Sequence, residues 1–193
     1  MHKIIFATNN KNKLIEVQKL VSNRFTILSL AEMQSTDELP ETHFTLQENA
    51  EEKAGFIFNK YKMNCFAEDT GMEIEILNGE PGVFSARYAG EQKSAKDNIE
   101  KVLQKMSGQT NRKAKFITVV CLFFNNRKYF FSGEIEGQIT LASSGQNGFG
   151  YDPIFQPTGY DLTFAQMNLN EKNKISHRAI AIAKTVDFLF SAK

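Results

Sequence analysis

The sequence has only two cysteines among 193 residues, and they form no recognisable motif. Cys65 and Cys121 both lie in apolar runs, and neither belongs to a Cys-x-x-Cys pair or has a His nearby at zinc-ligand spacing. We expect two buried, reduced thiols. The sequence therefore offers no disulfide framework of the kind that is typical of small secreted proteins.

Neither sign of charge is in excess, because 23 Lys and Arg residues stand against 22 Asp and Glu residues, a formal charge of +1. This balance disfavours a protein that coats duplex DNA or an anionic membrane with positive charge. Long apolar runs are also missing: none approaches the ~18 residues of a transmembrane helix, and residues 4–7 are too few for a signal peptide. We expect a cytoplasmic protein with no nucleic-acid or membrane partner, while a local lysine cluster would suffice for a small anionic ligand.

The beginning of the chain has the pattern of a strand, a helix and a second strand. Residues 4–8 form a short apolar run, which is typical of a strand buried on both faces. After the polar pair Asn9-Asn10, apolar residues recur at helical spacing as far as Val21, and residues 25–28 supply the second strand. This order predicts a βαβ unit.

The rest of the pattern extends this unit into an α/β fold without an internal repeat or a linker. It predicts, in order, a helix at about 45–61, a strand at 65–67 that ends at Glu68, a strand at 72–76 with one wet face, a helix capped by Ser94, a hairpin from 114 to about 139, a glycine-rich loop at 144–153 and a final helix capped by Ser176. We expect residues 1–193 to form one α/β domain with a mixed central β-sheet flanked by helices, in which the long hairpin could form a second lobe.

The segment Thr8-Asn9-Asn10-Lys11-Asn12-Lys13 stands where the first predicted strand ends and the first helix begins. Free N–H groups at a helix N-terminus attract anions, and Thr and Asn side chains can add hydrogen bonds to phosphate oxygens while Lys13 supplies charge. The glycines and the Lys-Ser/Thr pair of a Walker A loop are missing. The segment is a candidate phosphate site, and a helix N-cap followed by a solvated face is the alternative.

Two adjacent acids, Glu68 and Asp69, follow a buried strand and precede Thr70-Gly71. Burial of an acidic side chain in a core is energetically unfavourable. At the C-terminal end of a strand, these two acids would lie at the edge where α/β sheets bind ligands. Carboxylates there can hold Mg²⁺ or take a proton from an attacking water. Glu41, in the loop before the second helix, is a further candidate metal ligand. An acidic surface turn is the alternative for the tetrapeptide.

The glycine-rich loop at 144–153 is a candidate for contact with a base. Its glycines let the backbone approach a ligand, Phe149 offers a face for stacking, and Asp152 can accept a hydrogen bond. No helix follows, so a Rossmann dinucleotide site is rejected. A glycine-rich connection without a ligand is the alternative.

Residues 171–178 place three further candidates at the predicted start of the final helix. Lys172 and Arg178 would suit phosphate, and His177 could donate to a base. Cations are slightly unfavourable at a helix N-terminus, which favours ligand binding over the alternative of a charged helix turn.

Together these segments resemble, in the right order, the non-canonical purine nucleoside triphosphate pyrophosphatase family, the inosine/xanthosine triphosphate pyrophosphatases. The resemblance is carried by residues 8–13, Glu41-Thr42, Glu48-Asn49-Ala50, Glu68-Asp69-Thr70-Gly71, residues 81–90, residues 148–155 and Lys172 with Ile175-Ser176-His177-Arg178. Phe-Gly-Tyr-Asp-Pro and Ser-His-Arg are the specific blocks. The family commonly has Asp-Asp-Ser-Gly where this chain has Glu-Asp-Thr-Gly, a change that keeps the oxygen ligands and the hydroxyl.

The resemblance implies an elongated, two-lobed α/β fold with a nucleotide cleft between the lobes, a homodimer, and Mg²⁺ as the cofactor. It implies hydrolysis of ITP, dITP or XTP to the monophosphate and pyrophosphate, which removes deaminated purines from the nucleotide pool. Asp69 would accept the proton of the attacking water, and Asp69, Glu41 and the triphosphate would hold Mg²⁺. The implied substrate-binding residues are Thr8, Asn9, Asn10, Lys11, Asn12, Lys13, Thr70 and Lys172, mainly toward phosphate, and Phe149, Gly150, Tyr151, Asp152, His177 and Arg178 around the base.

The residue types are consistent with direct attack by water on the α-phosphorus, because no Cys, Ser–His or Lys nucleophile is evident. Three alternatives stay open at this point. The chain could be a related pyrophosphatase that acts on pyrimidine or modified nucleotides, or a nucleotide sensor without catalysis. A nucleic-acid-binding protein is disfavoured by the +1 charge.

Overall fold

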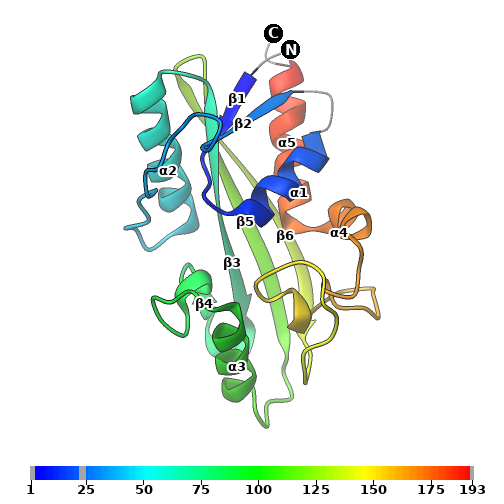
Figure 1. Ribbon diagram of the computed structural model, residues 1–193. Coiled ribbons are helices and arrows are strands. Elements are labelled where there is room, and N and C mark those ends of the chain that lie inside the picture. Colours follow the sequence, from blue (N-terminus) through cyan, green and yellow to red (C-terminus); the bar gives the residue numbers. More distant parts are fainter. Residues whose placement is uncertain (1–2, 22–24, 192–193) are drawn as a thin grey trace. The chain divides into compact units, whose positions relative to one another are not determined.

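The computed structural model describes residues 3–21 and 25–191 (Figure 1). The strands and α-helices of this part are β1 (Lys3–Phe6), α1 (Lys11–Val21), β2 (Thr26–Ser29), α2 (Leu46–Tyr61), β3 (Cys65–Ile74), β4 (Pro81–Gly82), α3 (Ala95–Lys105), β5 (Lys113–Phe124), β6 (Arg127–Ile139), β7 (Phe155–Pro157), α4 (Leu169–Ile175) and α5 (His177–Ser191). The strand order is β2-β1-β3-β5-β6-β7, and β4 pairs with β3. The predicted α/β class, a mixed sheet flanked by helices, is confirmed.

The chain forms two compact units, and we describe each by itself. The first unit consists of Met1–Asp69, Thr118–Gly133 and His177–Lys193, and the second of Thr70–Ile117 and Glu134–Ser176. Residues 3–21 and 25–191 contain no helix that is both long enough and apolar enough to cross a membrane.

The first unit begins with the predicted βαβ arrangement. β1 pairs with β2 in parallel over its whole length, from Lys3 opposite Thr26 to Phe6 opposite Ser29. β1 also pairs in parallel with β3, and this register ends with Phe6 opposite Phe66. β3 therefore continues past the point where β1 stops, which frees its next residues for contacts with helices.

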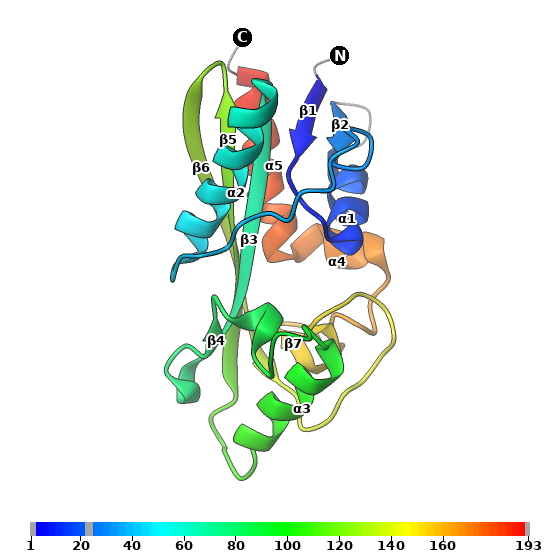
Figure 2. The same ribbon diagram turned by 60° about the vertical axis from the view of Figure 1, so that its left-hand side comes forward.

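Alternate residues of these strands build two cores on opposite faces of the sheet, as the period of a strand requires. One core packs against α1 and α5 and contains Ile4, Phe6, Phe66, Val120, Leu122, Val17, Ile182 and Val186. The other packs against α2 and contains Ile5, Ala7, Cys65, Ala67, Cys121, Ala50, Ala54 and Ile57. Figure 1 shows α2 apart from the pair α1 and α5, and in Figure 2 α2 and α1 again lie on opposite sides of β3.

The long hairpin is confirmed: β5 and β6 are neighbours in the sheet, joined through Asn125 and Asn126. Both asparagines adopt left-handed backbone angles, with φ of 50° and 59°. Asn tolerates this conformation better than most residues, and two such residues give the turn whose twist matches that of the strands. Each strand contributes to both units, so the hairpin does not by itself make a second lobe.

The prediction that Glu68-Asp69-Thr70-Gly71 ends one strand and precedes another was wrong. β3 is continuous from Cys65 to Ile74, and the tetrapeptide lies in its middle. Both acids are buried, Glu68 at 2% exposure and Asp69 at 7%. They stay within a strand because cationic side chains from three helices pair with them, a balance that cannot be read from the local sequence.

The predicted final helix, with Ser176 before its first residue, is α5, and a short helix that was not predicted, α4, precedes it and contains residues 171–175. α4 ends at Ile175, and α5 begins at His177, with Ser176 in extended conformation between them. Asn168 starts α4 through a capping box: its side chain accepts from the Glu171 N–H, and the Glu171 side chain accepts from the Asn168 N–H. Lys172 therefore belongs to α4 and the second unit, while Arg178 belongs to α5 and the first.

The second unit has a core of its own, built on residues 70–74 of β3, 113–117 of β5 and 134–139 of β6. Its buried members include Met72, Ile74, Val102, Met106, Phe116, Ile139, Ile154, Phe155 and Phe164. α3 begins as predicted at Ser94, whose side chain accepts from the Asp97 N–H. β4 and β7 pair with β3 and β6 here, both antiparallel.

Candidate active site

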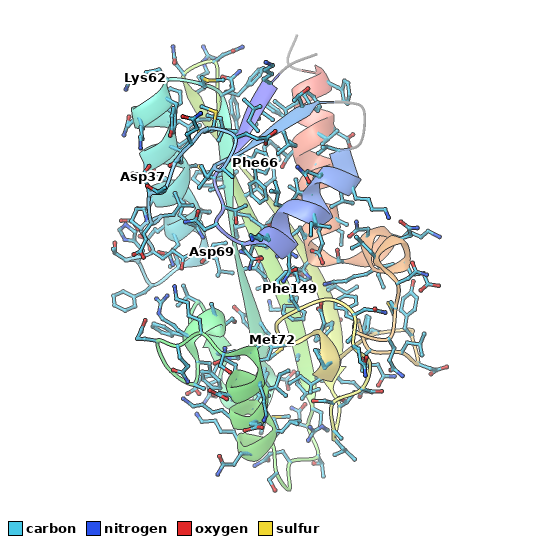
Figure 3. All side chains as sticks on the ribbon, in the orientation of Figure 1. Asp37, Lys62, Phe66, Asp69, Met72 and Phe149 are labelled. Atoms are coloured by element: carbon cyan, nitrogen blue, oxygen red, sulfur yellow. The ribbon has the colours of Figure 1, made fainter. Side chains whose placement is uncertain are left out.

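Glu68 and Asp69 extend to opposite faces of the sheet because they are neighbours in one strand. Glu68 follows the alternation of Phe66 and meets α1 and α5, whereas Asp69 follows that of Ala67 and meets α2. Figure 3 labels Asp69 on β3, between Phe66 and Met72. The two adjacent acids thus have separate surroundings.

On the first face, Glu68 belongs to a buried network of four charged side chains. The Arg178 Nε lies 2.9 Å from both Glu68 carboxylate oxygens, and the Nη1 of the same guanidinium donates to Glu16. Lys13 Nζ lies 3.2 Å from Glu68 Oε1. The two acids and two bases balance in charge, which is the condition for burying any of them.

This pairing sets the protonation of the network. Burial alone would raise the pKa of Glu68, but Arg178 and Lys13 outweigh it and hold that pKa below its ordinary value. Burial would lower the pKa of Arg178, yet the carboxylates of Glu68 and Glu16 raise it. Burial does lower the pKa of Lys13, and Glu68 offsets this only in part. Glu68 and Arg178 are charged in the folded protein at neutral pH.

On the second face, Lys53 joins the two predicted metal ligands. Its Nζ lies 2.9 Å from Asp69 Oδ1 and 2.6 Å from Glu41 Oε1. The other oxygen of Asp69 lies 3.5 Å from the side-chain nitrogen of Asn49. Burial would lower the pKa of Lys53, but Asp69 and Glu41 raise it above 10.5, so the ammonium stays charged.

Lys53 and Asn49 were missed by the sequence prediction. Both lie on α2 and are buried beside its apolar stripe of Ala50, Ala54 and Ile57. A Lys in such a position is rarely buried without a charged partner. Their spacing of four residues, one helical turn, was the available signal, because it places an amide and an ammonium side by side on the buried face.

The donor set fits a magnesium ion. One ammonium contacts both Glu41 and Asp69, so both carboxylates lie within reach of a single cation. In residues 3–21 and 25–191 no group of three or more His, Cys, Asp or Glu side chains could hold a metal. Mg²⁺ commonly takes one or two carboxylates and completes its shell with water and substrate phosphates, which suits a pair of ligands.

The segment from Thr8 to Lys13 forms the start of α1. Asn10 Oδ1 accepts from the N–H groups of Asn12 at 3.0 Å and Lys13 at 3.2 Å, and Thr8 Oγ1 accepts from the Asn10 N–H at 3.1 Å. Thr8 and Asn10 thus serve as local caps. Asn9, Asn10, Lys11 and Asn12 are exposed, so their contact with phosphate stays a prediction.

In the second unit the structure brings three of the predicted residues together. Lys172 Nζ lies 2.6 Å from Asp152 Oδ2, which also accepts from the Phe149 N–H at 2.8 Å. The same ammonium lies 5.0 Å from the centre of the Phe149 ring. The Tyr151 hydroxyl donates away from this group, to the Ser85 carbonyl at 2.8 Å.

The predicted residues are divided between the units. The first unit contains Thr8, Asn9, Asn10, Lys11, Asn12, Lys13, Glu41, Asp69, His177 and Arg178, and the second contains Thr70, Phe149, Gly150, Tyr151, Asp152 and Lys172. His177 is buried in the first turn of α5, where β6 approaches so closely that a Cβ on Gly133 would lie 2.2 Å from the His177 carbonyl. Contact of His177 and Arg178 with a base stays a prediction.

Comparison with known proteins agrees with this fold. A model of the Ham1 family matches residues 4–188. The chain is 50% identical over 186 residues to a dITP/XTP pyrophosphatase of Flavobacterium psychrophilum, covering 96% of this chain and 98% of the relative. It is 48% identical over 194 residues to a dITP/XTP pyrophosphatase of Porphyromonas gingivalis, with both chains covered completely.

Solved structures show the same likeness. The Ham1 protein of Staphylococcus aureus matches with a TM-score of 0.89 at 37% identity, covering 99% of this chain and 100% of that one. The fold is that of an α/β protein, and the cluster of Asp69, Glu41 and Lys53 contains groups that are able to take part in acid–base or metal chemistry. The chain belongs to the Ham1 family.

Proposed function

We propose that this chain is a nucleoside triphosphate pyrophosphohydrolase that cuts ITP, dITP and XTP to the monophosphate and pyrophosphate. Relatives named dITP/XTP pyrophosphatase, 50% and 48% identical over nearly the whole chain, support the reaction and its substrates. The observation that carries the proposal is Asp69 held with Glu41 by the buried Lys53. Removal of deaminated purines from the nucleotide pool is the role that follows.

Water is the proposed nucleophile, and the Asp69 carboxylate is its proton acceptor. Burial raises the pKa of Cys65 and of Cys121 to about 12, so neither thiol is a thiolate near neutral pH. Asp69 Oδ2 has the Asn49 amide at 3.5 Å, while Lys53 holds Oδ1. This arrangement orients the carboxylate and leaves Oδ2 the better placed of its two oxygens to take a proton.

Glu41 and Asp69 are the residues that would hold Mg²⁺. When bound, the ion would neutralise charge that develops on the pyrophosphate leaving group. Lys53 keeps the two carboxylates together, and Lys13 and Lys172 are the proposed cationic contacts of the phosphates.

The proposed choice of base follows from hydrogen-bond chemistry. Hypoxanthine and xanthine have a carbonyl acceptor at C6, whereas adenine has an amino donor there. Donors from His177 or Arg178 would pair with the carbonyl and would be left unpaired against the amino group, and Phe149 would stack on the ring. A site built for one such group can reject its analogue by orders of magnitude.

We further propose that residues 1–193 act as one pyrophosphatase domain, in a homodimer and in the cytoplasm. The family match over residues 4–188 supports the single domain. The homodimer rests on the family resemblance, and light scattering at micromolar concentration tests it, since a monomer mass would contradict it. The cytoplasm is where a nucleoside triphosphate substrate is found.

Release of pyrophosphate from ITP, XTP, ATP and GTP, each with and without Mg²⁺, tests the proposed function. We expect fast, Mg²⁺-dependent release from ITP and XTP, and rates lower by at least about a hundredfold for ATP, whose amino group mismatches the site. Equal rates on all four nucleotides would contradict the pool-cleaning role. Preference for a pyrimidine triphosphate in the same assay would contradict the purine assignment.

Lys53 gives a second test on the same reaction. Lys53→Gln removes the cation that joins Asp69 and Glu41, and because charge-assisted hydrogen bonds contribute about 1.5–3 kcal/mol each, we expect kcat on ITP to fall at least about tenfold. Lys60→Gln is the matched control, since Lys60 lies on the same helix and pairs with Asp37 at the surface. Equal kcat values for the two variants would exclude a role of Lys53 in the site.

A further inference from the structure

Residues 81–90 carry the family resemblance but have no role in the proposed reaction, and the structure suggests one. In the second unit, Ser85 is buried, and its hydroxyl accepts from the Met72 N–H at 2.9 Å and donates to the Gly82 carbonyl at 2.6 Å. Both bonds fix Ser85 to β3 and β4. The segment is therefore anchored at its centre by the Ser85 side chain.

Asn98 of α3 holds the same segment from its other side. It is buried, and its side-chain nitrogen donates to the carbonyls of Ser85 at 3.4 Å and Ala86 at 3.0 Å. Its side-chain oxygen accepts from the Ala89 N–H at 2.7 Å. Three hydrogen bonds of one buried amide thus go to the backbone of residues 85–89, which makes that backbone a rigid support.

Tyr151 connects the glycine-rich loop to this support. Its side chain is only 4% exposed, and its hydroxyl donates to the Ser85 carbonyl at 2.8 Å, the atom that Asn98 also binds. A hydroxyl engaged in this way inside a core is not directed at a ligand. Tyr151 fixes the loop only two residues from Phe149, the proposed stacking partner of the base.

The other side of the loop is fixed as well. Asp152 accepts from the Phe149 N–H and from Lys172 through one oxygen, Oδ2. A Cβ on Gly148 would lie 2.0 Å from that oxygen, and Gly148 has a φ of +72°, so the turn is shaped for the carboxylate. Phe149 is thus held between an ion pair and the Tyr151 hydroxyl.

We propose that Ser85, Asn98 and Tyr151 form a positioning frame that holds the glycine-rich loop, and with it Phe149, ready to receive the base. Tyr151 in this view is a positioning residue, which differs from the direct base contact that the sequence implied. The inference rests on the proposed function for its kinetic consequence. Its structural part, the tethering of the loop, is independent of the reaction.

The test is Tyr151→Phe, which removes only the hydroxyl. Without this hydrogen bond of ordinary strength the loop of the free protein adopts its binding-competent conformation less often, so we expect KM for ITP to rise about three- to tenfold while kcat changes less than about twofold. Tyr160→Phe is the control, because Tyr160 is an exposed residue of the same unit. A KM equal to that of the control, whatever the melting temperature, would overturn the frame.

Amide hydrogen exchange without nucleotide gives a readout that does not depend on activity. In Tyr151→Phe the exchange of residues 145–152 should speed up by at least about threefold over both the wild type and Tyr160→Phe. Unchanged exchange there would overturn the inference even if the enzyme cleaves ITP as proposed. Faster exchange in an enzyme that does not cleave ITP would support the frame and contradict the proposed function, so the two failures are distinguishable.

Asn98→Asp is a second variant on the same frame. It keeps the acceptor for the Ala89 N–H but turns the donor toward the Ser85 and Ala86 carbonyls into a second acceptor. We expect the same rise in KM and the same faster exchange at residues 145–152. A variant that folds but leaves both unchanged would contradict the role of Asn98, and if it does not fold, Tyr151→Phe decides the case.

Discussion

Replacement of Asp69 by Asn should lower kcat on ITP by about a hundred- to ten-thousand-fold, the range that a positioned general base contributes. The amide is nearly isosteric, but it cannot accept the proton of the attacking water and it removes one of two carboxylates from the proposed metal site. Lys53 would retain Glu41 as its partner, so the local structure should persist. Pyrophosphate release at saturating ITP and Mg²⁺ measures the effect.

Asp37→Asn is the control for this substitution. Asp37 is also an acid of the first unit with a lysine partner, Lys60, but it lies at the surface. We expect its kcat to stay within about twofold of the wild type, because exposed ion pairs contribute little. Unchanged turnover in Asp69→Asn would remove the proposed proton acceptor and would favour a nucleotide sensor over an enzyme.

Replacement of Arg178 by Met should have the largest effect on stability. The side chain is 1% exposed, and its loss leaves the carboxylates of Glu68 and Glu16 buried without their common partner. Breaking a buried pair in this way costs about 3–5 kcal/mol. For a chain of this size we expect the melting temperature to fall by about 6–20 °C. Differential scanning calorimetry is the measurement.

Two companion variants identify the cause. Arg127→Met removes an exposed arginine and should shift the melting temperature by less than about 2 °C. Arg178→Lys keeps the charge but loses the planar guanidinium whose nitrogens reach both acids. Its melting temperature should therefore lie between those of the wild type and Arg178→Met. A melting temperature of Arg178→Met close to that of Arg127→Met would show that the network does not stabilise the fold.

The parts of the fold that local pattern determines were predictable. The spacing of apolar residues gave α1 and α2, and the Asn125-Asn126 pair gave the hairpin, because these signals depend on neighbours in sequence. Ser176 correctly marked the start of α5, but the short helix α4 before it was not predicted. The resemblance did not indicate that the Tyr151 hydroxyl donates to the Ser85 carbonyl.

The largest difference between the predicted and the observed secondary structure is the continuous strand β3. Two acids, Thr and Gly are typical of a turn, and only distant residues reverse that preference. Arg178 lies 110 positions from Glu68, and Lys53 lies 16 positions from Asp69. A single sequence does not show such pairings, so the site of greatest chemical interest was also where local prediction was weakest.

The interleaving of the two units along the chain has a consequence for the evolution of the gene. Three segments make the first unit and two make the second, so the backbone passes between them four times. No uninterrupted stretch of the gene encodes either core: a fragment that ends at Asp69 lacks Val120, Ile182 and Val186, which pack with Phe6 and Phe66. Recombination therefore cannot add, remove or exchange either unit as one continuous segment. A truncation from either end removes residues of the first unit before it reaches the second. We therefore expect the two units to be inherited together, as a single gene segment.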